Sequence, residues 1–167
     1  MTSSRSAKVT LPADDQILIT RDFDAPRRLV YEAWTTPELV KRWWNAKRGE
    51  VTVAEIDLRV GGSWRYVMVT DEGGFEVAFH GEFDEISPSE RIVSTEVFEG
   101  MPGEEPPSED DAAANTVTFA EVGGRTKLTI LSQYPSRDIR DAVIATGMED
   151  GMQDAMDLLE EVARSLG

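Results

Sequence analysis

The spacing of hydrophobic and polar residues changes several times along the chain, and each change predicts a different kind of element. Residues 16–23 alternate and are rich in isoleucine and threonine, which predicts a strand. Apolar residues then recur at helical spacing within 29–34 and again within 39–44. Thr36 and Pro37 lie between these two stretches and are typical of a helix start. We therefore expect one strand followed by two short helices.

The middle of the chain alternates with a period of two, which is typical of antiparallel strands with one buried face. Glycine pairs at 61–62, 73–74 and 123–124 mark turns between these strands. Gly81 lies inside one predicted strand and indicates either a bulge or a group that packs closely over the sheet. Six strands are expected after the two helices, within residues 51–56, 63–70, 75–84, 91–98, 115–122 and 125–134.

Two further segments complete the pattern. Residues 100–115 contain three prolines and five carboxylates without periodicity, so we expect a loop that is either a lid or a tolerated acidic insertion. Residues 137–166 carry an apolar stripe at helical spacing, which Gly147 and Gly151 interrupt one turn apart. These glycines indicate close packing or room for a ligand. A long helix that covers an antiparallel sheet predicts the α+β class.

The size and composition of the chain narrow the classes of protein to consider. The length of 167 residues predicts a single domain at residues 16–167, after a flexible N-terminal segment at residues 1–15. The net charge of −15 argues against a nucleic-acid partner, because phosphate backbones are bound by clustered lysine and arginine. No apolar run approaches the roughly 18 residues that a membrane span needs. Because the chain also has no cysteine and no signal peptide, we expect a cytoplasmic protein.

Large aromatic side chains are concentrated near the start of the chain. Residues 23–44 contain three of the four tryptophans and one of the three tyrosines. Together with aromatic strand residues and helix methionines, they predict a pocket for a flat or aliphatic ligand. The alternative is a packed core built from the same residues. The predicted ligand-binding residues are Trp34, Trp44, Trp64, Tyr66, Met68, Phe79, Met148 and Met152.

Candidate catalytic groups are few. His80 is the only histidine, and with Glu82 it could act as a general base, but the acidic residues on its strand face favour an exposed ion pair. Arg65 alternates with Trp64 and Tyr66, so we expect its side chain on the opposite face, in a surface ion pair. Without a cysteine or a second histidine, no metal site, cofactor or catalytic set is predicted. A binding protein is therefore favoured over an enzyme.

Five stretches of the sequence resemble the START-like (SRPBCC) superfamily. More narrowly, they are similar to bacterial relatives of the C-terminal domain of the heat-shock-protein-90 ATPase activator. The first stretch is the most specific, because it combines Phe-Asp-Ala-Pro with a tryptophan, Pro-Glu and a Trp-Trp pair. Together the stretches cover the chain from about Ile17 to Leu166. They read FDAPRRLVYEAWTTPELVKRWW, DLRVGGSWRYVM, GEFDEISPSERIV, TVTFAEVGGRTKLTI and GMQDAMDLLEEV.

The resemblance implies a helix-grip fold, in which a curved seven-stranded antiparallel sheet and two short helices accompany one long C-terminal helix. It implies a cavity between sheet and helix that binds an apolar or amphipathic small molecule. The alternatives are a polyketide cyclase/dehydratase-like enzyme and a co-chaperone-like interaction protein of the stress response. Many relatives have Gly-Trp where this chain has Gly151-Met152, which implies a larger or softer pocket. Exposed aromatic residues near Trp43 could mediate a homodimer.

Overall fold

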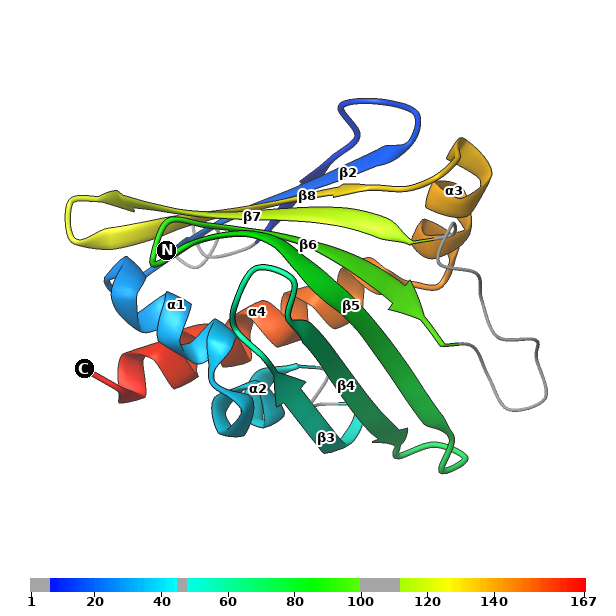
Figure 1. Cartoon of the computed structure of the whole chain (residues 1–167), viewed down its shortest axis with the longest axis horizontal. Coiled ribbons are helices and arrows are strands. Elements are labelled where there is room, and N and C mark those ends of the chain that lie inside the picture. The colour runs from blue at the N-terminus through cyan, green and yellow to red at the C-terminus, as the bar shows by residue number, and fades with distance from the viewer. Residues whose placement is uncertain (1–6, 45–47, 100–111) are drawn as a thin grey trace.

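The computed structural model of the chain describes residues 7–44, 48–99 and 112–167, which form an α+β fold with a curved antiparallel sheet. Figure 1 shows the sheet arching over the helices, with α4 running beneath it. The fold class predicted from the sequence is thus confirmed. The elements in chain order are β1 (Lys8–Thr10), β2 (Gln16–Phe23), α1 (Arg27–Thr35), α2 (Pro37–Trp43), β3 (Gly49–Ile56), β4 (Ser63–Thr70), β5 (Glu76–Ser87), β6 (Arg91–Phe98), β7 (Ala113–Val122), β8 (Arg125–Gln133), α3 (Arg137–Ala145) and α4 (Met148–Ser165).

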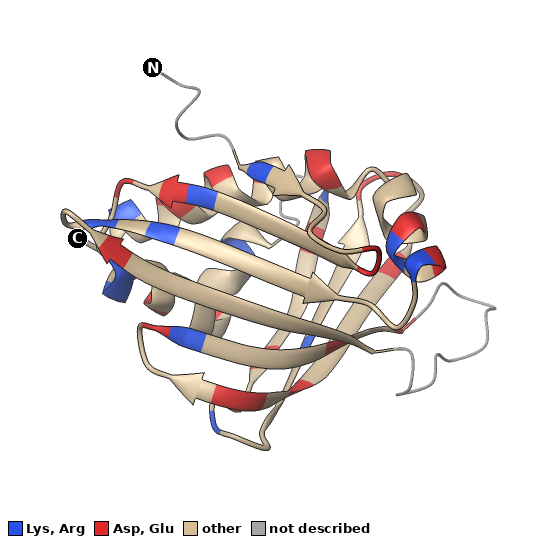
Figure 2. Cartoon of the chain, turned by 90° about the horizontal axis from the view of Figure 1, so that it is seen from above, with Lys and Arg blue, Asp and Glu red and all other residues tan. Residues whose placement is uncertain are grey.

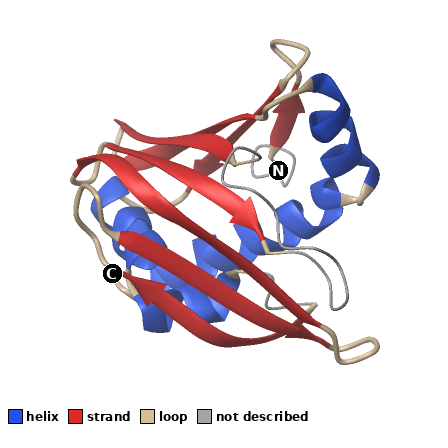
Figure 3. Ribbon diagram, turned by 45° about the vertical axis from the view of Figure 1, so that its right-hand side comes forward, coloured by secondary structure: helices blue, strands red, loops and turns tan. Residues whose placement is uncertain are grey.

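The sheet follows chain order except at one place. Its order is β1-β2-β8-β7-β6-β5-β4-β3, so the early strand β2 pairs with the last strand β8. Strands β3 to β8 join neighbours in sequence, as hairpin connections require. The register shifts once between Phe83 and Glu85 and once between Val51 and Val53. Such irregularities increase the local twist, which helps the sheet to curve around the helix beneath it (Figure 3).

The sheet has eight strands, one more than the seven expected. The additional strand is β1, a three-residue edge strand that pairs with β2. It lies in the stretch that the sequence analysis assigned to the N-terminal segment, because so short an edge strand carries too few residues to show a period. The loop expected at residues 100–115 ends earlier, because β7 already begins at Ala113. Residues 100–111 of that expected loop lie outside the described residues.

The predicted long C-terminal helix is two helices, which corrects the sequence expectation. α3 ends at Ala145 and α4 begins at Met148. Gly147 lies between them with a φ of 80°, a left-handed conformation that ends a helix and that side chains rarely adopt. The break changes the direction of the chain, so α3 packs at the end of the sheet while α4 crosses beneath it (Figure 3).

A buried arginine joins α4 to the sheet. The Arg21 guanidinium on β2 donates hydrogen bonds to the Met156 carbonyl and to Asp157 Oδ1, the latter at 3.0 Å, and its Nη2 lies 3.6 Å from Glu160 Oε1. Glu160, also buried, accepts a hydrogen bond of 2.7 Å from the Asp24 amide. Charges this far from water need such partners. The network therefore fixes the second half of α4 against β2.

Arg21→Met is expected to lower the free energy of unfolding by about 3–5 kcal/mol, because it removes the guanidinium that lies beside the buried Glu160 carboxylate. Urea denaturation of the variant and the unsubstituted chain measures the change. Arg27→Met is the matched control: Arg27 forms a partly exposed pair with Glu90 at 3.9 Å, and its loss should cost less than about 0.5 kcal/mol. Equal effects of the two substitutions would contradict the role of Arg21.

Candidate ligand-binding cavity

A cavity of about 690 Å³ lies between the concave face of the sheet and the first half of α4. This volume is in the range of sites that enclose small molecules. The residues predicted to bind a ligand all border it, and their role in binding remains a prediction. Those residues are Trp34, Trp44, Trp64, Tyr66, Met68, Phe79, Met148 and Met152.

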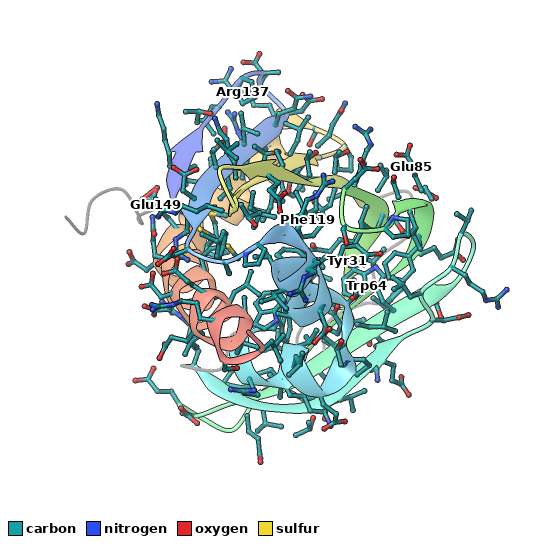
Figure 4. All side chains as sticks on the ribbon, turned by 90° about the vertical axis from the view of Figure 1, so that its left-hand side faces the viewer. Tyr31, Trp64, Glu85, Phe119, Arg137 and Glu149 are labelled. Atoms are coloured by element: carbon teal, nitrogen blue, oxygen red, sulfur yellow. The ribbon has the colours of Figure 1, made fainter. Side chains whose placement is uncertain are left out.

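The interior is filled at one end and hollow at the other. Beneath α1, Tyr31 and Trp34 pack edge-on against Phe119, with ring centroids 5.4 and 6.1 Å apart. Figure 4 shows Tyr31, Phe119 and Trp64 pointing into the space between sheet and helices, while Glu85, Arg137 and Glu149 point outward. The interior is therefore a packed core beneath α1 and a pocket toward the first half of α4.

Glycines and methionines at the start of α4 form one border of the cavity. Gly147 and Gly151 both border the cavity and carry no side chain. Met148 and Met152 each follow one of these glycines, border the same cavity and are half-buried. The buried part of the helix begins later, at Ala155. The two glycines differ. Gly147 has open space where a Cβ atom would lie, whereas at Gly151 that atom would lie 3.2 Å from the Arg48 Nε, so Gly151 matches the reading of close packing.

Interlocking aromatic rings form the wall opposite. Trp44 lies edge-on to Tyr66 and to Phe79, with centroids 5.3 and 5.6 Å apart, and Trp64 lies 4.8 Å from Tyr66. Trp64 is held in place because its Nε1 donates a hydrogen bond of 3.1 Å to the Thr95 carbonyl. This wall is therefore constrained, whereas the methionines of α4 can adapt.

Gly81 explains how Trp64 reaches Thr95. It pairs with Trp64 in the sheet, and a Cβ atom at this position would lie 1.8 Å from the Thr95 carbonyl oxygen and 2.6 Å from the Trp64 Nε1. The close approach is the correct one of the two readings of this glycine, since the register shift of β5 falls at Phe83 instead. No side chain would fit without moving backbone.

One end of the cavity is polar, and the sequence analysis missed it. Ser94, Asn115 and Ser132 are aligned partners on β6, β7 and β8, and all three border the cavity. Glu96 lies two residues further along β6, on the same face as Ser94. Its Oε1 accepts a hydrogen bond of 2.8 Å from Asn115 Nδ2. The sequence did contain a signal for it: Glu96 alternates in phase with Ile92, so its carboxyl is expected on the inward face of the strand.

Burial raises the pKa of the Glu96 carboxyl above its ordinary value of 4.5, and the hydrogen bond from Asn115 opposes part of this rise. Two phenols share the enclosure. The pKa of Tyr134 is raised to about 12, first by burial and then by the charge of Glu96, and the pKa of Tyr66 is raised for the same reasons in the same order. The polar end thus combines a carboxyl that resists ionisation with two phenols that stay neutral.

Glu96→Gln is expected to become increasingly more stable than the unsubstituted chain as the pH rises. A carboxyl whose pKa is raised on folding contributes stability that is complete below the unfolded value and is lost as the pH rises through the folded value. The neutral amide keeps the contact with Asn115 and escapes that loss. Melting temperatures measured from pH 4 to pH 8 test this, with the solvated Glu82→Gln on β5 as the matched control. A difference that does not change with pH would contradict it.

The residues considered for acid–base chemistry lie on the outer face of the sheet. Arg65 forms two hydrogen bonds of 2.9 Å with the Glu99 carboxylate, and His80 Nδ1 lies 2.9 Å from Glu99 Oε2. The hydrogen bond from Arg65, more than that from His80, lowers the pKa of Glu99. Glu82 is exposed. The surface ion pair predicted for Arg65 and the carboxylate partner predicted for His80 are both confirmed, and the carboxylate is Glu99 in each case.

Other kinds of site find no support in the part of the chain that the structure describes. Within residues 7–44, 48–99 and 112–167, no group of three or more acidic, histidine or cysteine side chains is placed to hold a metal ion. None of the described helices combines the length and the apolarity that crossing a bilayer requires. In the view of Figure 2, acidic and basic positions are interspersed along the strands and helices.

Comparison with known proteins places the chain in a family. The profile of the family described as "Activator of Hsp90 ATPase homolog 1-like protein" matches residues 24–164. No curated protein matches the sequence. Similar solved structures include protein Ms6760 from Mycobacterium smegmatis, 23% identical with a TM-score of 0.82 over 94% of this chain and 96% of that one. A protein from Rhodobacter sphaeroides is 22% identical with a TM-score of 0.82, over 96% and 99% of the two chains. These structures show that the chain shares their fold.

Proposed function

Given that the chain belongs to the Activator of Hsp90 ATPase homolog 1-like family, we propose that it is a binding protein that encloses an apolar or amphipathic small molecule between its sheet and α4. The observation that carries this proposal is the cavity of about 690 Å³, because it is walled by aromatic rings and has a polar group at one end. Apolar clefts with a few placed polar groups are the usual form of small-molecule sites.

The division between a constrained wall and an adaptable floor supports binding of more than one ligand shape. The rings of Trp44, Trp64 and Tyr66 pack on one another, so they keep their positions when a ligand enters. Met148 and Met152 on α4 can change rotamer at small cost. A flat ligand would stack on the wall, and the methionines would close over it.

The proposal is tested on the full chain with a panel of naphthalene derivatives, medium-chain alcohols and fatty acids. Native mass spectrometry reports the stoichiometry, and a rise in melting temperature reports binding to the folded state. We expect one molecule per chain for at least one class. If no class binds, the cavity is not a ligand site and the proposal is wrong.

A cyclase- or dehydratase-like enzyme is the second candidate, and Glu96 is the observation in its favour. An enclosed carboxyl with a raised pKa, near two tyrosines, is the type of group that transfers protons in active sites. Recovery of the bound compound separates the two candidates. An unchanged mass after long incubation favours binding alone, and a changed mass that Glu96→Gln prevents favours catalysis.

Met152→Trp is expected to weaken binding of the best panel compound by about tenfold, because the indole occupies part of the cavity that the ligand needs. Isothermal titration calorimetry measures the affinity. Ile144→Trp on α3 is the control, since Ile144 is 38% exposed and does not border the cavity. Unchanged affinity in Met152→Trp would place the ligand elsewhere.

A further inference from the structure

We infer that the polar end of the cavity is a subsite that selects, among apolar molecules, those that carry a neutral hydroxyl group, with Glu96 as the recognising residue. This inference rests on the proposed function and specifies the chemistry of its ligand. It depends on where the polar groups lie, on which of their atoms remain available, and on the charges that surround them.

The polar groups form two adjacent rows across the concave face. The first row is Ser94, Asn115 and Ser132 on three neighbouring strands. In the second row Glu96 on β6 pairs with Ala113 on β7. Because Ala114 pairs with Gln133, the next residue, Tyr134, lies opposite Ala113 on the side of β8. Ala113 has a small side chain, and Glu96, Ala113 and Tyr134 all border the cavity.

One oxygen of Glu96 remains available to a ligand. Asn115 is the donor to Oε1, and no other described side chain forms a hydrogen bond with this carboxyl. No buried side-chain oxygen or nitrogen of the described residues lacks a partner. Because Glu96 keeps part of its accessible surface, its second oxygen is reached from the cavity rather than sealed in protein. That oxygen can exchange a hydrogen bond with a hydroxyl group, and Asn115 fixes its direction.

The surroundings of Glu96 favour a neutral partner over a cation. Polar groups that border the same cavity include Tyr66 from β4, Asn115 from β7 and Tyr134 after β8, and these three are uncharged. α3 and α4 contribute apolar side chains to this border, including Val143. Among the described residues, the one charged group on the border besides Glu96 is Arg48, which is exposed and lies beside Gly151 on α4. A cationic ligand would have to ionise Glu96 inside an aromatic enclosure and would be disfavoured by Arg48 at its edge.

Three probes of nearly equal size test the inference. 2-Naphthol can donate a hydrogen bond, 2-methoxynaphthalene cannot, and 2-naphthylmethylamine carries a positive charge at pH 7. On the full chain, titration calorimetry is expected to give 2-naphthol an affinity about fivefold to tenfold above that of 2-methoxynaphthalene, which corresponds to one additional hydrogen bond. The amine should bind more weakly than 2-naphthol.

The preference should depend on Glu96. In Glu96→Leu, the affinity for 2-naphthol is expected to exceed that for 2-methoxynaphthalene by less than about twofold. The leucine side chain can neither donate nor accept a hydrogen bond. Glu82→Leu, the same substitution at an exposed position of β5, should keep the full ratio. If Glu96→Leu does not fold, the carboxyl ¹³C signal of Glu96, assigned with Glu96→Gln, should shift with 2-naphthol and stay in place with 2-methoxynaphthalene.

The outcomes separate this inference from the proposed function. Equal binding of 2-naphthol and 2-methoxynaphthalene, or a preference that survives in Glu96→Leu, overturns the hydroxyl subsite while the binding function stands. Tighter binding of the amine shows that Glu96 acts as an ionised anchor and also overturns it. If 2-naphthol does not bind while other panel compounds do, the inference fails by itself. If nothing in the panel binds, both fail together.

Discussion

The attachment of the second half of α4 to the sheet is the constraint on which the interior depends. From Ala155 onward the helix is packed into the core, and Arg21 ties its middle to β2 through Met156, Asp157 and Glu160. Before Ala155, Met148, Gly151 and Met152 border the cavity, and Gln153 exchanges two hydrogen bonds with the backbone of Ala7, next to β1. Buried ion networks add little net stability, but they allow few alternative packings.

The same alternation that builds each strand also separates the chemistry of the two faces of the sheet. On β4, Trp64 and Tyr66 point inward while Arg65 points outward to Glu99. Charges on the outer face remain near water, where ion pairs are inexpensive to form and contribute little. Two charged side chains point inward instead. Arg21 on β2 reaches α4, where Met156, Asp157 and Glu160 are its partners. Glu96 on β6 borders the cavity and gives the apolar interior a polar end.

The cavity combines three surfaces with different physical properties. The aromatic wall is held by ring packing and by the hydrogen bond from Trp64 to the Thr95 carbonyl, which Gly81 makes possible. The α4 surface is adaptable, since methionine has several rotamers of similar energy. The polar rows on β6, β7 and β8 provide direction. A ligand that uses all three would be oriented by its polar group, positioned by the wall and covered by the methionines.

Local sequence patterns were enough to predict several strands and the direction of several side chains. Period and turn residues located β2, β4 and β6 with the bounds that the structure has, and the outward direction of Arg65 followed from simple alternation. The eight pocket residues were recognisable because aromatic side chains and methionines on inward faces have few other places to go. Gly147 was visible as an interruption, yet whether it bends or ends the helix depends on what the next turn packs against. The ion network of Arg21 and the polar rows around Glu96 join residues far apart in the sequence, so their partners exist only once β2 meets α4 and β6 meets β7. The alternation along β6 can predict that the Glu96 carboxylate faces inward. The cavity that it borders forms only when the sheet and α4 come together.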